Sequence, residues 1–172
     1  VVPVYDNSNT IEKLCNEIRE VLNENNFNGK FNIILVNDGS TDDSWNKIKN
    51  LHLQNPEIYT LINLTKNFGQ IPALLSGFNH CDSKCTISIS ADLQDTPKIM
   101  PKMINAWQKG SKLVIANRKS RNDGFVYNIL SNIAWKLMRI FVSKDIPKYG
   151  FDYFLIDEMI NDYYVKNSDN HT

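Results

Sequence analysis

The sequence predicts an α/β fold, with a Rossmann-like, mostly parallel central sheet and helices on both faces. Short β-branched runs alternate with longer segments in which apolar residues recur at helical spacing. A polar cluster follows each predicted strand. The chain has 172 residues, 42% of them apolar and 22% charged, with no apolar run long enough to span a bilayer. This length suits one domain with a sizeable core, which we assign to residues 1–165, followed by a polar tail at 166–172.

The first half of the chain supplies two strands and two helices. Residues 1–5 form a short apolar strand that tolerates Pro3 near its end. Apolar residues then recur every three or four positions over 10–25, which predicts a helix. Residues 31–36 are a continuous apolar run, typical of a strand buried on both faces. A helix over 42–53 follows a polar turn.

The second half repeats the alternation. Strands are predicted over 58–64, 85–90 and 113–116, because β-branched residues gather there. Helices are predicted over 70–79 and 97–109, the second with a proline in its first turn. The chain lacks an initiator Met and begins in a predicted strand, so we expect it to be part of a longer protein.

Composition excludes several classes of function. Lys and Arg total 19, as do Asp and Glu, so no global field recruits nucleic acid. The three cysteines form no CxxC pair, which argues against a disulfide framework or zinc site and favours a reducing compartment. The three histidines are scattered and indicate no metal site.

Polar clusters follow all five predicted strands. Because the carboxyl ends of parallel strands meet at one edge of a sheet, we expect these clusters to line one cleft for a polar, anionic ligand. The clusters are residues 6–7, 38–40, 66–67, 92–95 and 117–118.

The fourth cluster is the most informative. Asp92, Gln94 and Asp95 offer three oxygen ligands directly after strand 85–90. Mg²⁺ typically takes one or two carboxylates plus substrate phosphates, so this stretch predicts a metal-bridged diphosphate site. The alternative is that Asp95 or Thr96 caps the next helix and Asp92 is a turn residue.

Residues near the first two strand ends are candidates for binding a nucleotide. Asp38 can accept a hydrogen bond from a base N–H or a ribose hydroxyl, and Gly39 suits a sharp turn or a close backbone approach. The alternative is a plain turn in which Ser40 or Thr41 caps the next helix. The ring of Tyr5 could stack on a base, although core packing is the commoner fate of such a ring. There is no GxGxxG or Walker sequence.

Two basic or amphipathic segments complete the candidates. Arg118 and Arg121 could clamp a phosphate, or lie in a solvated charged loop. The predicted helix 125–142 has a wide apolar face with cations beside it. That pattern is typical of a helix at a membrane interface, and also of a helix covering a sheet.

Six motifs occur in an order that resembles the glycosyltransferases of family 2 with the GT-A fold. The sequence is most similar to the polyprenyl-phosphate sugar transferases, the dolichol-phosphate mannose synthase and bactoprenol glucosyltransferase group. The motifs are residues 2–5, 36–42, 66–70, 90–95, 117–121 and 150–156.

The resemblance implies a role for each matching residue. The residues that would bind the nucleotide are Pro3, Tyr5, Asp38, Lys66 and Ala91. Asp92 and Gln94 would bind the metal. The catalytic residues would be Arg118 and Arg121, which face donor or acceptor phosphate, and Asp152, which lies beside the reacting centre. The family usually has an Asp where this chain has Ser90, so its DxD motif is reduced to the second Asp.

The resemblance also implies a reaction. A sugar would pass, with inversion, from a UDP- or GDP-sugar to a polyprenyl phosphate, with Mg²⁺ or Mn²⁺ as cofactor. The reaction would occur at the cytoplasmic face of the membrane, contacted through helix 125–142 and a C-terminal segment absent from this chain. A homo-oligomer is compatible with the sequence. The alternatives are transfer to a surface polysaccharide or other hydroxyl acceptor, with Asp152 as base, and a non-catalytic sugar-nucleotide binding module.

Overall fold

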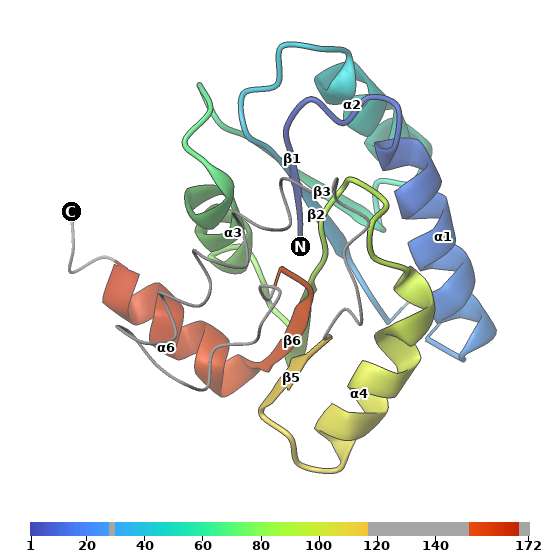
Figure 1. Ribbon diagram of the computed structural model, residues 1–172, viewed down its shortest axis with the longest axis vertical. Coiled ribbons are helices and arrows are strands. Elements are labelled where there is room, and N and C mark those ends of the chain that lie inside the picture. Colours follow the sequence, from blue (N-terminus) through green and yellow to red (C-terminus); the bar gives the residue numbers. More distant parts are fainter. Residues whose placement is uncertain (28–29, 117–151, 169–172) are drawn as a thin grey trace, which may run out of the picture.

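The computed structural model describes residues 1–27, 30–116 and 152–168 (Figure 1). Three strands pair in parallel in the order β1-β2-β3, with β2 in the middle. They are β1 (Val2–Val4), β2 (Ile33–Asn37) and β3 (Tyr59–Asn63). Every residue of β2 is buried, as its continuous apolar run predicts.

A second set of strands pairs in the order β4-β6-β5, and β6 is antiparallel to both neighbours. These strands are β4 (Cys85–Ser88), β5 (Leu113–Ile115) and β6 (Phe154–Asp157). The prediction of a mostly parallel sheet is therefore confirmed, but β6 was not predicted, and it introduces the antiparallel pairing.

Hydrogen bonds at Val1 join the two sets edge to edge. The α-amino group of Val1 donates to the carbonyl oxygen of Ile87 at 2.7 Å, and the amide of Ile89 donates to the carbonyl oxygen of Val1 at 3.3 Å. This is the pattern of neighbouring parallel strands, so β1 lies beside β4. The carboxyl ends of β1 to β5 consequently face one rim.

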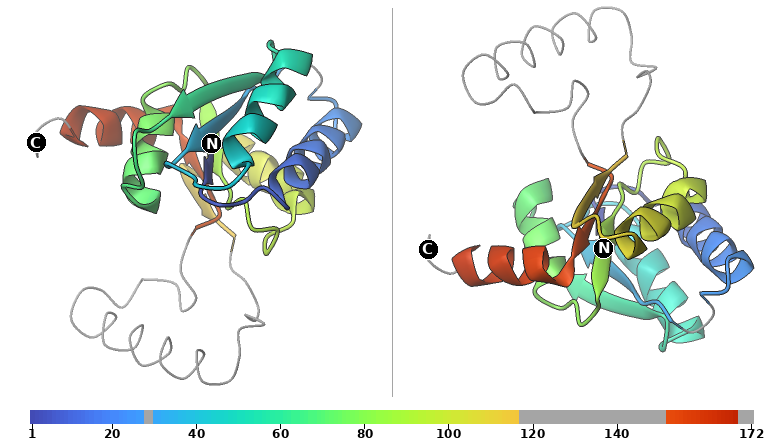
Figure 2. Two further views of the ribbon diagram at one scale, coloured as in Figure 1. Left: turned by 90° about the horizontal axis from the view of Figure 1, so that it is seen from above. Right: turned by 90° about the horizontal axis from the view of Figure 1, so that it is seen from below.

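Helices cover both faces of the sheet, as the sequence predicts (Figure 2). On one face lie α1 (Ile11–Glu24), α2 (Ser44–Gln54) and α4 (Met100–Gln108), packed over the larger hydrophobic core. On the other lie α3 (Gln70–Phe78) and α6 (Glu158–Ser168), over two smaller clusters. Helix α6 continues to Ser168, past the boundary at 165 assigned from the sequence.

The helix predicted over 97–109 begins with a 3-10 turn, η1 (Pro97–Ile99). Thr96 caps this turn, because its Oγ1 accepts the amide of Lys98 at 3.4 Å. Among the described residues, no helix is both long and apolar enough to cross a bilayer. The predicted helix 125–142 lies outside them.

Candidate functional site

The loops that follow β1 and β2 are locked together at the rim. The Asp6 carboxylate accepts the amide of Thr41 at 2.7 Å, and Asp42 accepts the amides of Ser44 at 2.9 Å and Ser8 at 3.0 Å. Burial alone would raise the pKa of Asp42, but hydrogen bonds from Ser44 and Ser8 outweigh it and hold that pKa below its ordinary value. The two loops therefore form one rigid edge of the site.

Asp38 ties the end of β2 to the loop between β3 and α3. Its side chain is buried, with one carboxylate oxygen accepting the amide of Phe68 at 2.8 Å and the other the amide of Gly69 at 2.9 Å. A carboxylate oxygen can accept a second hydrogen bond, so this arrangement is compatible with nucleotide binding. The predicted contact of Asp38 with base or ribose stays a prediction.

Gly39 is the place where two backbones approach closely, as its position in the sequence predicts. Its φ is +66°, and a Cβ at this position would lie 2.6 Å from the nitrogen of Asn67 and 2.7 Å from the Cα of Lys66. Only glycine fits here without moving the loop of residues 66–69.

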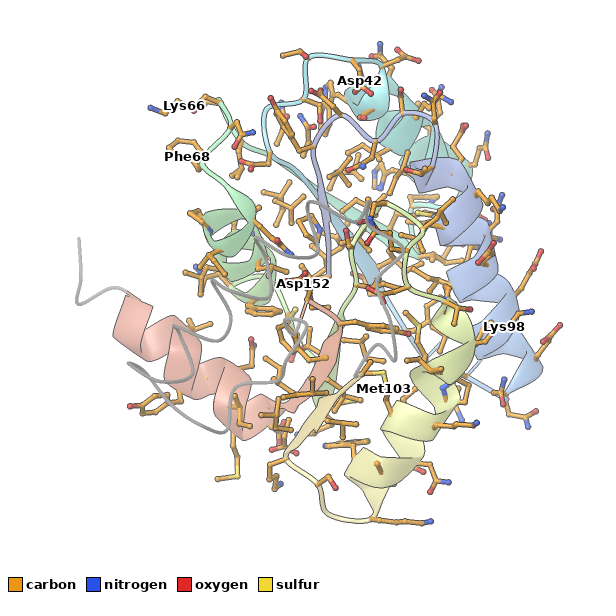
Figure 3. The ribbon with its side chains drawn as sticks, in the orientation of Figure 1. Asp42, Lys66, Phe68, Lys98, Met103 and Asp152 are labelled. Atoms are coloured by element: carbon orange, nitrogen blue, oxygen red, sulfur yellow. The ribbon has the colours of Figure 1, made fainter. Side chains whose placement is uncertain are left out.

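The candidate aromatic and basic residues at this end of the rim are exposed. Tyr5 is 44% exposed, so the alternative that its ring packs in the core is wrong. The Nζ of Lys66 lies 5.1 Å from the ring centroid of Phe68, at the tip of the loop, away from Asp152 (Figure 3). Pro3 lies in β1 opposite Val36.

The candidate metal ligands occupy a tight turn after β4. Asp92 and Gln94 are both exposed, and Asp92 Oδ1 accepts the amide of Gln94 at 3.0 Å. Leu93 between them has a φ of +60°. The alternative that Asp92 is a turn residue is thus confirmed. Its hydrogen bond to Gln94 uses Oδ1 and does not involve Oδ2. The side chain of Ala91 packs in the hydrophobic core.

This donor set suits a hard divalent cation that completes its coordination with a diphosphate. Within the ranges that the structure describes, no group of three or more His, Cys, Asp or Glu side chains gathers to form an all-protein metal cage. One carboxylate and one amide on an open rim are the kind of ligands that leave positions for substrate oxygens.

Asp152 lies across from that turn. Strand β6 begins two residues after Asp152, and its first residue, Phe154, pairs with Ser88 at the end of β4. The hydroxyl of Ser88 donates to the carbonyl oxygen of Asp152 at 3.3 Å. Two predicted site residues from distant parts of the sequence, Asp92 and Asp152, are therefore brought to the same part of the rim. Arg118 and Arg121 lie outside the described residues.

Sequence reasoning missed the elements that hold Asp152 in place. Ser88 and Tyr153 both make hydrogen bonds in this region, and neither was a candidate. The apolar run over residues 154–156 could have indicated β6. A cavity of about 690 Å³ lies at the opposite end of the strands, beside Val1, and none of the predicted site residues lines it.

Comparisons with known proteins agree with this architecture. The family described as Glycosyl transferase family 2 matches residues 1–161. The chain is 30% identical to the glycosyltransferase sll0501 of Synechocystis, over 93% of this chain and 50% of that protein. It is 34% identical to the bactoprenol glucosyl transferase of Shigella phage SfV, over 72% of this chain and 40% of that protein. The chain thus spans about half the length of the curated relatives it matches.

Solved structures show the same fold. A mannosyltransferase from Pyrobaculum calidifontis, in complex with GDP-Man and Mn²⁺, superposes with a TM-score of 0.66 at 18% identity, over 94% of this chain and 44% of that one. Glucosyl-3-phosphoglycerate synthase from Mycobacterium tuberculosis, in complex with UDP, gives 0.62 at 14% identity, over 92% and 56%. The chain has the GT-A fold, it is similar to bactoprenol glucosyl transferases, and it belongs to glycosyltransferase family 2.

Proposed function

We propose that this domain transfers a sugar from a nucleotide diphosphate sugar to a polyprenyl phosphate, with inversion, at the cytoplasmic face of a membrane. The observation that carries the proposal is that residues on both sides of Asp92, Ser88 and Thr96, hydrogen-bond to the segment of Asp152 and Tyr153 at the rim. Family membership and the similarity to bactoprenol glucosyl transferases support it.

In this proposal the rim divides into a nucleotide part and a reaction part. Tyr5 and Asp38 would contact the base and ribose, Lys66 would contribute to nucleotide binding, and Asp92 with Gln94 would hold Mg²⁺ or Mn²⁺ at the diphosphate. A bound cation stabilises negative charge on the leaving diphosphate. The hydrogen bond from the amide of Gln94 restrains the Asp92 carboxylate, so a cation held there would need little reorganisation of this side chain in the transition state.

The role of Asp152 depends on the acceptor. A phosphate monoester has a second pKa of about 6, so it is largely a dianion at neutral pH and attacks without a strong base. A sugar hydroxyl needs a general base, and the position of Asp152 beside the end of β4 favours this residue for that role. Transfer to a surface saccharide is therefore the second candidate function.

The proposal is tested by incubating the protein with labelled UDP- and GDP-sugars, undecaprenyl phosphate in detergent, and Mn²⁺ or Mg²⁺. We expect a lipid-linked sugar that disappears with EDTA and falls at least about 100-fold in Asp92→Ala. Asp82→Ala is the matched control, because Asp82 is an exposed aspartate beside the cavity at the other end of β4. Full transfer by Asp92→Ala would contradict the proposed metal role.

Asp152→Asn separates the two acceptors. With a lipid phosphate we expect transfer to stay within a few-fold of the unmodified protein. With a hydroxyl acceptor we expect a loss of about 100-fold or more. Transfer from any nucleotide sugar would exclude a purely binding role for the domain.

A further inference from the structure

The turn that carries Asp92 and Gln94 has a backbone conformation that its surroundings must hold. Leu93 has a φ of +60°, which is disfavoured for a residue with a Cβ. Such conformations persist where neighbouring structure fixes them. The start of the turn is fixed by the hydrogen bond between Ile89 and Val1, which joins β4 to β1.

Tyr153 fixes the other end of the turn. Its hydroxyl donates to the carbonyl oxygen of Thr96 at 3.2 Å, and Thr96 in turn caps η1. The side chain is only 2% exposed and packs in the larger hydrophobic core, so the hydroxyl has a defined position. Burial raises the pKa of this phenol, and the nearby Asp95 carboxylate raises it further, so the hydroxyl remains a donor at working pH.

The backbone of the same residue belongs to the segment that carries Asp152. The amide of Ala116, after β5, donates to the carbonyl oxygen of Tyr153 at 2.9 Å. One residue earlier, the carbonyl oxygen of Asp152 accepts the hydroxyl of Ser88 in β4. Residues 152 and 153 are thus bonded to β4, to the end of β5 and to the turn of residues 92–96.

We propose that Tyr153 is a positioning residue, whose hydroxyl holds the turn of residues 92–96 at a set distance from Asp152. One buried side chain then fixes the position of Asp92 and Gln94 relative to Asp152. The significance of this tether for sugar transfer rests on the proposed function. The tether itself does not, and hydrogen exchange can measure it without any ligand.

The test compares Tyr153→Phe with Tyr59→Phe. Tyr59 is an equally buried tyrosine, but it is the first residue of β3, at the end away from the rim, and its hydroxyl lies near Cys15 and Arg19. Calorimetric titration of Mn²⁺ in the presence of UDP or GDP is the readout, with the melting temperature as a check on folding. We expect Tyr153→Phe to weaken Mn²⁺ binding about three- to tenfold, the usual effect of one hydrogen bond, and Tyr59→Phe to leave it unchanged.

Unchanged Mn²⁺ affinity in Tyr153→Phe, or an equal loss in Tyr59→Phe, would overturn the proposal. Absence of any Mn²⁺-dependent nucleotide binding in the unmodified protein would instead count against the proposed function. Hydrogen exchange then tests the tether directly. The amides of residues 93–96 should exchange several-fold faster in Tyr153→Phe than in Tyr59→Phe, and equal rates would refute the tether.

Discussion

Replacing Gly39 with alanine tests whether the β2 rim loop and the loop of residues 66–69 act as one unit. The new Cβ would overlap the carbonyl carbon of Lys66 and lie 2.6 Å from the nitrogen of Asn67, where ordinary contacts begin at 3.4 Å, so one loop must move by at least roughly 0.8 Å. The positive φ costs about 1–2 kcal/mol for alanine and the overlap about 1–3 kcal/mol. Together they predict a melting temperature lower by about 5–15 °C.

The more discriminating effect is on nucleotide binding. Moving the loop pulls the amides of Phe68 and Gly69 away from Asp38, and hydrogen bonds to a charged group are worth about 1.5–3 kcal/mol each. We therefore expect UDP or GDP affinity to fall at least about tenfold by calorimetry. Gly110→Ala is the control, because Gly110 has a φ of +106° but open space around its Cβ position. It should lose stability and keep nucleotide affinity. Normal affinity in a folded Gly39→Ala protein would refute the coupling of the two loops.

Three further measurements check other parts of the structure. The indole of Trp107 donates a hydrogen bond to Asp157 at 2.8 Å and holds the pKa of that carboxyl below its ordinary value. The ionised carboxylate therefore stabilises the fold fully above about pH 4, and this stabilisation decreases as the pH falls toward the lowered pKa. Urea midpoints measured from pH 6 to pH 3 should fall less in Asp157→Asn than in the unmodified protein, and parallel curves would exclude this contribution. Ser90→Asp adds a carboxylate two residues from Asp92 and should tighten Mn²⁺ binding by several-fold in calorimetry; weaker binding would mean that position 90 does not face the cation. The fully buried Cys15 thiol, with its pKa raised by burial to about 12, should react with a thiol reagent at pH 8 only after unfolding, and labelling of the folded protein would contradict its burial.

The local pattern of apolar residues in the sequence was sufficient to predict most of the helices and strands. The helical spacing over 10–25 and the apolar run over 31–36 correspond to α1 and β2 within two residues at each end. These elements bury the residues that create the pattern, so pattern and structure agree. Strand β6 was missed although β1 and β5 are shorter, because it lies outside the predicted alternation of strands and helices and pairs with strands earlier in the chain.

For the candidate site, the sequence indicated residue types but not their partners. That Gly39 needs a close backbone approach could be predicted, whereas the identity of the approaching loop, residues 66–69, could not. The links from Ser88 and Tyr153 are contacts from a side chain to the backbone of a segment far away in the sequence. Such contacts depend on register, which a single sequence does not reveal when one of the paired strands is unrecognised.

The antiparallel return of β6 has a consequence for the protein during its synthesis. Asp152 leaves the ribosome sixty residues after Asp92, while β1, β2 and β3 and the loops around Asp38 are complete before either. A nascent chain can therefore assemble the loops proposed to bind the nucleotide while the carboxylate of Asp152 is still untranslated. Ribosome-bound chains arrested before residue 152 would then acquire the capacity to hold a nucleotide ahead of the capacity to use it.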